Sequence, residues 1–321
     1  MILKKEPEQL LNEIRQGGYS KSMQPLVSVV TTAYNIEKYL PTAIESVLSQ
    51  KTNFKVEMII GEDCSTDKTL EIALNYQKKY PQIIKVLIPE KNQGITPNCI
   101  NTHNACKGKY IALLDGDDYW TTNSKLQLQI DFLDKNPDYA GSAHQAKIIY
   151  NNSNKEDFFG QNTDAEFGVM DTISNRKFHT SSLVYRKEVW DKVGGIPSGV
   201  AVSNDRAIYP MVAIFGKIKY FKEVMCIYRQ TGFGISSRAT YEQIKTELLM
   251  IPWLRNIDKK FPLIRFKSFL HYSIYTNPIK ISFLPLVQHY FLFVICSFSY
   301  FPGNLGDLKH GTFEFFKKLN F

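Results

Sequence analysis

The chain has 321 residues, of which 44% are hydrophobic and 22% charged, a composition that excludes an intrinsically disordered chain. Lys and Arg number 23 against 25 acidic residues in residues 1–205 but 16 against 6 in residues 206–321, so the net charge of +8 arises in the C-terminal third. That asymmetry indicates an anionic partner, either nucleic acid or an anionic membrane leaflet, unless it is only a basic soluble surface. The five cysteines include no C-x-x-C pair, so they suggest neither a zinc site nor a disulfide framework.

The first predicted element is a charged helix within residues 1–24, which lacks the apolar segment of a secretory signal, so we expect a cytoplasmic protein. Strands and helices then alternate. Predicted strands occupy residues 25–35, 55–63, 83–89 and 109–115, and predicted helices occupy residues 37–50, 67–80 and 96–108. This alternation predicts an α/β fold with a mostly parallel sheet and helices on both of its faces.

The pattern becomes less regular after residue 123. Predicted helices occupy residues 124–136 and 202–216, and residues 178–195 read as a strand, a helix and a glycine stop. Residues 138–150 form a predicted strand, and the turn-rich residues 151–168 a loop or excursion over the site. Residues 217–238 predict a pair of strands that ends in a Gly-rich turn.

Polar side chains follow three of the predicted strands. The first strand ends in Thr31, Thr32, Tyr34 and Asn35, the second in Glu62, Asp63, Ser65 and Asp67, and the fourth in Asp115, Asp117 and Asp118. Ligands of open parallel sheets bind outside the carboxyl ends of the strands, so we expect these three clusters to converge on one crevice.

The acidic loop in "YIALLDGDDYW" places Asp115, Asp117 and Asp118 directly after a buried strand. Three like charges within four positions repel one another, and Mg²⁺ or Mn²⁺ would compensate them with hard oxygen ligands. A solvated turn is the alternative.

Competing nucleotide motifs are absent, since no G-x-G-x-x-G follows a strand and "GGIPSGV" lacks the Lys-Ser/Thr of a P-loop.

Taken together, the spaced motifs resemble family 2 inverting glycosyltransferases of the glycosyltransferase-A (GT-A) fold, particularly bacterial enzymes that build surface polysaccharides. The resemblance covers about residues 26–238. It rests on "PLVSVVTTAYNIEKYLPTAIESVLSQ", "GEDCSTDKT", "NQGITPNCINTHNACKGKYIALLDGDDYW", "FHTSSLVYRKE" and "SNDRAIYPMVAIFGKIKYFKEVMCIYRQTGFGISS". It implies a GT-A catalytic domain in residues 25–238, followed by a helical extension in residues 239–321.

The resemblance implies a role for each matching residue in donor binding. Thr32 and Tyr34 are similar to residues that hold the nucleobase, with Tyr34 stacking on it. Asp63 resembles the carboxylate that accepts the imide N–H of uracil, although a turn-forming Asp would fit the same position. Asp115 resembles the contact to the ribose and to the metal, and Asp67 is expected to be structural, bonding the start of its helix.

The metal and the base are also implied by the resemblance. Asp115 and Asp117 are the expected ligands of Mn²⁺ or Mg²⁺, which neutralises the charge that develops on the leaving diphosphate. Asp118 is expected to cap the turn. Asp205 matches the position of the general base, although an N-cap Asp is the local alternative. Its neighbour Asn204 stands where many members carry a second acid.

A second departure from the family lies in "YRQTGFGISS", where Thr231 replaces a histidine that many members carry. Arg229, Ser236 or Arg238 would then have to supply the contact to the diphosphate or metal. The six histidines show no metal-ligand spacing, which predicts structural or surface roles for all of them. We expect Trp120 to be a wall of the core or the site, unless it stacks on a sugar ring.

The C-terminal extension contains the apolar segment 281–301, in which Pro285, Gln288 and His289 interrupt the run that a spanning helix needs. Helices that lie on a membrane or pack on the catalytic domain are favoured over a span. The surrounding lysines and arginines suit an anionic inner leaflet. Nucleic acid is not expected, because no recognised binding module accompanies the charge.

These patterns predict an enzyme that transfers a sugar, with inversion, from a nucleotide donor, expected to be a UDP-sugar, to a hydroxyl of a glycan or polyprenyl-linked acceptor. One rival is a sugar-phosphate nucleotidylyltransferase, which would need a Gly-rich basic loop that "TTAYNIEKYL" does not offer. The other rival is a non-catalytic, membrane-associated carbohydrate-binding protein.

Overall fold

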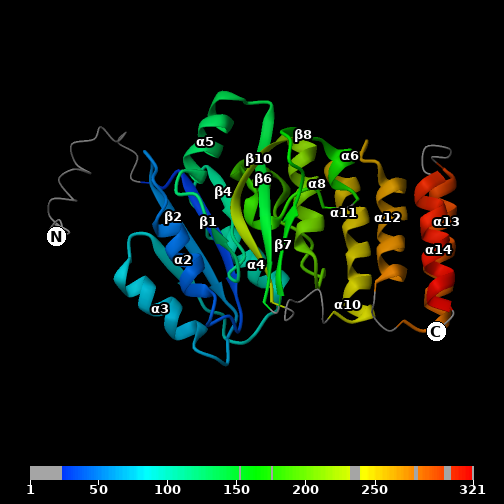
Figure 1. Cartoon of the computed structure of the whole chain (residues 1–321), viewed down its shortest axis with the longest axis horizontal. Helices are drawn as coiled ribbons and strands as arrows, with labels where there is room; N and C mark the ends of the chain where they lie inside the picture. Colours follow the sequence, from blue (N-terminus) through cyan, green and yellow to red (C-terminus); the bar gives the residue numbers. More distant parts are fainter. Residues whose placement is uncertain are drawn as a thin grey trace.

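The structure of the chain is a computed structural model that describes residues 24–151, 153–174, 176–231, 239–277, 281–299 and 305–319. The predicted N-terminal helix and the predicted Gly-rich turn after residue 231 therefore lie outside the described residues. In the described part, one ten-stranded sheet runs through the middle of the molecule, with helices packed around it (Figure 1).

The first half of the sheet is parallel, as the alternation of strands and helices predicts. Its strands are Val27–Ala33 (β1), Val56–Glu62 (β2), Ile84–Leu87 (β3) and Tyr110–Leu113 (β4). The connecting helices are Leu40–Leu48 (α2), Thr69–Lys79 (α3) and Ile95–Asn104 (α4). β1 is the central member and pairs in parallel with both β2 and β4.

Helices cover both faces of this parallel region. Val29 of β1 belongs to a core cluster with Ile44 of α2, whereas the next residue, Val30, belongs to the opposite cluster with Cys99 of α4. Successive side chains of a strand point to opposite faces, so the two clusters lie on the two sides of the sheet. A strand buried on both faces explains the continuous apolar run in the sequence of β1.

The second half of the sheet mixes strand directions. It contains Tyr119–Trp120 (β5), Tyr139–Tyr150 (β6), Val184–Arg186 (β9) and Lys217–Gln230 (β10). The strand order is β3-β2-β1-β4-β9-β6-β10-β5, in which β9 runs antiparallel to β4 and β6 while β10 runs parallel to β6. The predicted α/β class is confirmed, with a sheet that is parallel in its first half and mixed in its second.

Two local predictions are wrong. Residues 151–168 contain two strands rather than a loop, namely Ser153–Phe159 (β7) and Ala165–Phe167 (β8). β7 pairs with β6, and β8 pairs with β10. Pairing with a neighbouring strand therefore outweighs the low strand propensity of a polar segment that lacks alternation. The predicted strand pair in residues 217–230 is the single strand β10, because register shifts between Phe221 and Cys226 absorb its polar middle.

Four further helices and a 3₁₀ turn connect these strands. They are Lys125–Lys135 (α5), Val169–Thr172 (α6), Thr180–Ser182 (η1, 3₁₀), Lys187–Val193 (α7) and Asn204–Phe215 (α8). α7 ends at Gly194, whose φ of 77° is left-handed, so the predicted glycine stop is confirmed.

The C-terminal extension is helical in its described residues. Its elements are Tyr241–Lys245 (α10), Thr246–Leu249 (η2, 3₁₀), Met250–Ile257 (α11), Leu263–Thr276 (α12), Phe283–Phe298 (α13) and Leu305–Leu319 (α14). Met250 of α11 and Leu270 of α12 belong to the same core cluster as Met211 of α8. These two helices therefore pack on the body that carries the sheet.

α13 and α14 form the end of the molecule that is farthest from α3 (Figure 1). They have a separate small core, which includes Phe293 and Phe315 and joins them to Tyr275 of α12. None of the helices in the described parts of the chain is long and apolar enough to cross a membrane. The division of the chain at residue 238 stays a prediction.

Candidate active site

The polar ends of β1, β2 and β4 meet at one edge of the sheet, as the sequence predicts. The backbone N–H of Asp63, just after β2, donates to the carbonyl of Ala33 at the end of β1 (3.0 Å). Gly116 in the acidic loop lies so close to β1 that a Cβ there would be 2.9 Å from the carbonyl oxygen of Thr32. Glycine thus lets the acidic loop approach the end of β1.

Asp118 is the most deeply buried carboxylate of the acidic loop, with 1% of its surface exposed. One carboxylate oxygen accepts from the backbone N–H of Arg229 on β10 (2.9 Å), and the other accepts from the hydroxyl of Ser181 in η1 (2.6 Å). The expectation that Asp118 caps its own turn is therefore wrong for its side chain, which joins three separate segments. Its backbone N–H closes the turn by donating to the carbonyl of Asp115 (2.9 Å).

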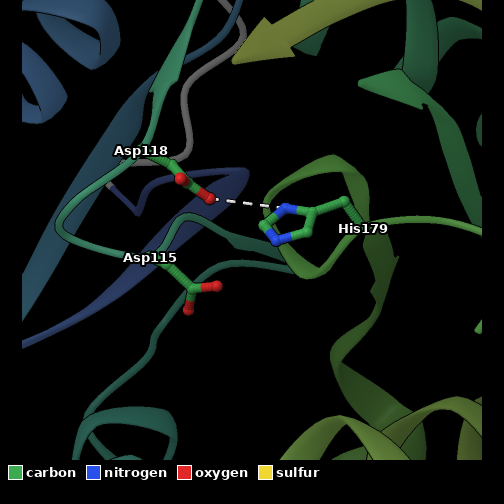
Figure 2. Close-up of side chains that lie close together, drawn as sticks. All are labelled: Asp115, Asp118 and His179. Carbon is green, nitrogen blue, oxygen red and sulfur yellow. Dashed lines mark ion pairs between the residues drawn. The ribbon is translucent and has the colours of Figure 1, made fainter. Parts of the chain in front are cut away.

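His179 lies beside this carboxylate, with Nδ1 3.3 Å from Oδ2 of Asp118 (Figure 2). Burial, together with the nearby cation of Arg176, lowers the pKa of His179 to about 3, so the imidazole is neutral. A neutral imidazole is a metal ligand. The prediction that all six histidines are structural or surface groups missed this placement; the only signal was that "FHTSS" lies within the segments that resemble the family.

The structure gathers a donor set that fits a divalent cation. One ligand atom each from Asp115, Asp118 and His179 lie within 4.8 Å of one another (Figure 2). Carboxylate oxygens suit Mg²⁺ and Mn²⁺, and an imidazole nitrogen is a ligand of transition metals. Asp117, the other ligand expected from the sequence, is half-buried in the same loop and its backbone carbonyl accepts from the guanidinium of Arg229 (2.9 Å).

The electrostatics of the loop are unfavourable without a cation. Burial first, and then the neighbouring charges of Asp117 and Asp205, raise the pKa of Asp115 to about 7, although Arg176 opposes the shift. Burial and the same kind of repulsion raise the pKa of Asp118 well above its ordinary value. A cation bound among these carboxylates would offset the repulsion.

The expected donor-binding residues differ in exposure. Tyr34 is 46% exposed just beyond β1, and Thr32 is half-buried near the end of that strand. Asp63 is only 3% exposed, and its two carboxylate oxygens accept from the backbone N–H groups of Gln93 and Gly94 (both 2.8 Å). Each oxygen of a carboxylate has a second lone pair, so Asp63 retains capacity to accept an imide N–H.

Asp67 is structural, as expected. Its carboxylate accepts from the backbone N–H of Thr69 at the start of α3 (2.9 Å) and from that of Glu37 (3.1 Å). Burial would raise the pKa of Asp67, but these hydrogen bonds outweigh burial and lower it.

Asp205 is the second residue of α8, and Ser203, with a left-handed φ of 60°, occupies the N-cap position. The local N-cap reading of Asp205 is therefore wrong. Its side chain pairs with Arg176 (3.0 Å), a residue that sequence reasoning did not single out. The adjacent Asn204 points elsewhere, since its side-chain oxygen accepts from the hydroxyl of Thr96 (2.6 Å).

Arg229 is tied to the acidic loop from β10. Its guanidinium lies 4.4 Å from the ring centre of Tyr119 as well as bonding the carbonyl of Asp117. The other residues considered for a diphosphate contact, Ser236 and Arg238, lie outside the described residues.

Trp120 is a wall of the core, as one of its two readings predicts. It is buried, its indole N–H donates to the carbonyl of Ser181 (2.8 Å), and the ammonium of Lys125 lies 4.2 Å from its ring centre. The other reading, stacking on a sugar ring, does not fit a buried indole. Burial lowers the pKa of Lys125 to about 7.

A cavity of about 90 Å³ opens beside Asp205, between α8 and the C-terminal helices. Its polar lining comes from Arg176, Ser203, Asp205, Arg206, Glu247 and Asn277. Among the described residues, the side-chain oxygen of Asn277, which is buried, has no hydrogen-bond partner. The C-terminal extension thus supplies part of the wall next to Asp205.

Comparisons with known proteins find a matching family and several relatives. The model of the family described as "Glycosyl transferase family 2" matches residues 28–194. An uncharacterized protein of Mycobacterium tuberculosis is 33% identical over 210 residues, which cover 65% of this chain and 60% of that protein. An uncharacterized glycosyltransferase of Nostoc sp. is 32% identical over 227 residues, covering 68% of this chain and 69% of the relative. The chain thus spans about 60% of the length of the mycobacterial relatives that it matches.

A shorter stretch matches TuaG of Bacillus subtilis, named "Putative teichuronic acid biosynthesis glycosyltransferase TuaG", which is 39% identical over 110 residues (34% of this chain, 42% of TuaG). Among solved structures, Staphylococcus aureus TarS in complex with UDP-GlcNAc matches with a TM-score of 0.65 at 18% identity, covering 85% of this chain and 81% of TarS. A mannosyltransferase of Pyrobaculum calidifontis in complex with GDP-Man and Mn²⁺ matches with a TM-score of 0.54 at 14% identity, covering 95% and 87%. Both likenesses concern the fold.

Proposed function

The chain belongs to glycosyl transferase family 2, and from this premise we propose that it transfers a sugar, with inversion, from a UDP-sugar to a hydroxyl of a glycan or polyprenyl-linked acceptor. The observation that carries the proposal is that the carboxylates of the acidic loop and the carboxylate of Asp205 lie near one another in different surroundings. The acidic loop after β4 concentrates negative charge, and Asp205 lies near enough to contribute to the raised pKa of Asp115 while pairing with Arg176.

The donor occupies the crevice at the carboxyl ends of β1, β2 and β4 in this proposal. Tyr34 stacks on the nucleobase, Thr32 contacts it, and Asp63 accepts the imide N–H of uracil. The exposure of Tyr34 and the fixed orientation of Asp63 support these roles. TarS in complex with UDP-GlcNAc supports a uracil base, whereas the mannosyltransferase complex with GDP-Man makes guanine the alternative to test.

Asp115 and Asp117 hold Mn²⁺ or Mg²⁺ in this proposal, and Asp115 also contacts the ribose. Asp117 is favoured over Asp118 as a ligand because Asp117 is half-buried, whereas Asp118 is almost fully buried and its side chain is already tied to Arg229 and Ser181. A bound cation supplies positive charge for the leaving diphosphate. Asp118 and His179 form the competing ligand pair beside Asp115.

Asp205 is the general base of the proposed reaction. It accepts the proton of the acceptor hydroxyl while the new bond to the anomeric carbon forms on the face opposite the departing diphosphate, which inverts that carbon. Arg176 orients the carboxylate through their ion pair. The cavity beside Asp205 would receive the acceptor, with walls from α8 and the C-terminal helices.

The sugar-phosphate nucleotidylyltransferase rival loses support, because the family assignment concerns glycosyl transfer. The non-catalytic rival predicts carbohydrate binding without turnover. We also propose a role in cell-surface polysaccharide biosynthesis, for which TuaG is a named precedent. The proposed place of action is the cytoplasmic face of the cell membrane, through peripheral contact with anionic lipid.

The test begins with calorimetric titration of UDP, GDP, CDP and dTDP, each with and without Mn²⁺, into the wild-type chain and Asp117→Ala. The surface variant Asp191→Ala is the matched control, since Asp191 pairs with Lys187 on α7. We expect metal-dependent, UDP-selective binding that Asp117→Ala loses and Asp191→Ala keeps. Transfer from UDP-sugars is then assayed, and the anomeric configuration of the product is determined by NMR. Absence of nucleotide binding under every condition would overturn the proposal.

A further inference from the structure

α13 presents two very different sides. Leu286, Phe293 and other residues of one side are buried against α12 and α14, whereas the opposite side carries Leu284, Phe291, Ile295 and Phe298. These four positions are spaced by seven, four and three residues, which places them on one side of a helix. α13 contains no charged residue.

α14 continues this apolar surface. Its exposed side carries Phe313 and Phe316. The two helices are joined by rings in contact, because Tyr290 stacks on Phe315 with ring centres 3.9 Å apart, and each of these two rings also touches the exposed phenylalanine that follows it in the chain. We call the six exposed residues the apolar face: Leu284, Phe291, Ile295, Phe298, Phe313 and Phe316.

The apolar face is unusually exposed for its size. Each of its six side chains is between 57% and 75% exposed, and the two helices that carry them, α13 and α14, form one end of the molecule (Figure 1). Isolated exposed apolar residues are ordinary, but a contiguous group of large ones marks a binding surface.

Lysines flank the apolar face. Lys309 and Lys317 are exposed on α14. Burial raises the pKa of the Cys296 thiol on α13 and the charge of Lys267 opposes that shift, which places Lys267 of α12 beside α13. From α11 to α14 the described chain carries eight basic residues against three acidic ones. Aromatic side chains with flanking lysines are the composition of helices that lie in the interface of an anionic membrane.

We propose that the apolar face and its flanking lysines form a membrane-binding surface, which lays α13 and α14 on an anionic lipid bilayer. This inference gives the proposed peripheral contact a defined surface, and it stands independently of the proposed transfer reaction. A second copy of the chain is a poorer occupant, because a two-fold contact through this face would bring two positively charged margins together.

The surface is structurally connected to the candidate active site. The ammonium of Lys318 on α14 donates to the carbonyls of Tyr275 and Asn277, and Asn277 lines the cavity beside Asp205. A bilayer under α13 and α14 would therefore hold lipid-linked molecules at the side of the chain to which the acceptor cavity belongs.

The test uses the full chain and sedimentation with vesicles of phosphatidylcholine alone or mixed with phosphatidylglycerol. We expect binding only to the mixed vesicles, and loss of binding at high salt. The triple variant Phe291→Ser/Ile295→Ser/Phe298→Ser and the double variant Phe313→Ser/Phe316→Ser should each weaken binding by roughly tenfold or more, because each removes apolar area that the bilayer would bury. Lys309→Glu/Lys317→Glu should weaken binding to the mixed vesicles.

Phe158→Ser is the matched control, because Phe158 is an exposed phenylalanine on β7, far along the chain from this surface, and it should leave vesicle binding unchanged. UDP binding by each variant is measured in parallel, so loss of the lipid surface is separated from loss of the donor site or of the fold. Vesicle binding that the variants leave intact would overturn the proposal. So would a wild-type dimer, seen by analytical ultracentrifugation, that the triple variant dissociates without any vesicle binding.

Discussion

Ser181 and Asp118 are joined by a hydrogen bond of 2.6 Å between two fully buried side chains from distant parts of the sequence. The same hydroxyl oxygen accepts the backbone N–H of Asp115 (3.1 Å), and the carbonyl of Ser181 accepts the indole N–H of Trp120 (2.8 Å). One serine of η1 therefore holds the acidic loop at three points. The conformation of the acidic loop therefore depends on η1 as well as on β4, the strand that precedes the loop.

Ser181→Ala should destabilise the chain by about 1–3 kcal/mol, because it leaves the buried Asp118 oxygen and the Asp115 N–H without this partner. It should also weaken Mn²⁺ binding, since the acidic loop loses its fixed position. Denaturant unfolding and calorimetry measure the two effects. Ser182→Ala is the matched control, because in the described part of the chain its hydroxyl bonds the carbonyl of His179 (2.6 Å) and no group of the acidic loop. It should lower stability while keeping Mn²⁺ affinity. Equal loss of Mn²⁺ affinity in both variants would contradict a specific role for Ser181.

The two metal-ligand sets make different predictions for single variants. If Asp115 and Asp117 hold the cation, Asp117→Asn should weaken Mn²⁺ binding by more than about tenfold, and His179→Asn should have a smaller effect. If Asp115, Asp118 and His179 hold the cation instead, His179→Asn should weaken Mn²⁺ binding more than Asp117→Asn does. Manganese titration followed by electron paramagnetic resonance compares the variants without requiring turnover. Asp191→Asn serves as the control for removal of a remote carboxylate.

Asp205→Asn should lower kcat for sugar transfer by about 10²- to 10⁴-fold, because the amide cannot accept the proton of the acceptor hydroxyl. UDP binding should stay near the wild-type value, since Asp205 lies on α8 rather than at the strand ends that form the donor crevice. A steady-state assay with calorimetry on the same preparation tests both statements. Glu242→Gln, at an exposed position of α10, is a control that should change neither value. Retained turnover in Asp205→Asn would remove this residue from the base position.

Much of the fold could be predicted because it follows from local pattern. β1 to β4 and the helices between them are continuous apolar runs and amphipathic segments, and each such segment forms the expected element. β7 could not be predicted in this way, because "SNKEDFF" has neither alternation nor an apolar run. It is a strand because β6 offers it a partner, which is a property of the fold rather than of the segment.

The site shows the same division between local and long-range information. The carboxylates of the acidic loop could be found from sequence because they cluster within four positions. His179 and Arg176 lie some sixty residues further along the chain, and they reach the site because β9 pairs antiparallel with β4 and brings η1 to the end of that strand. Nothing in the spacing of the histidines reports that pairing. Site residues that are brought together by strand pairing can be predicted only when the topology of the sheet is known.

The buried histidines outside the active site predict acid sensitivity of the fold. Burial lowers the pKa of His103 to about 4, and its ring stacks on Trp190 with centres 4.2 Å apart. The unfolded chain takes up a proton at this histidine near pH 6.5, whereas the folded chain does not until about pH 4. His103 therefore lowers the free energy of unfolding as pH falls below 6.5, by up to about 2 kcal/mol at pH 5.

Urea unfolding at pH 7 and pH 5 measures this effect. Other groups also titrate in this range, so the informative quantity is the difference in pH dependence between the wild-type chain and His103→Gln. The variant should lose less free energy of unfolding on acidification than the wild type does, even though its stability at pH 7 is lower. His310→Gln is the matched control, because His310 is exposed on α14, whereas His103 is buried. A pH dependence that His103→Gln leaves unchanged would show that His103 takes up its proton without unfolding, for instance by a local opening of the contact between α4 and α7.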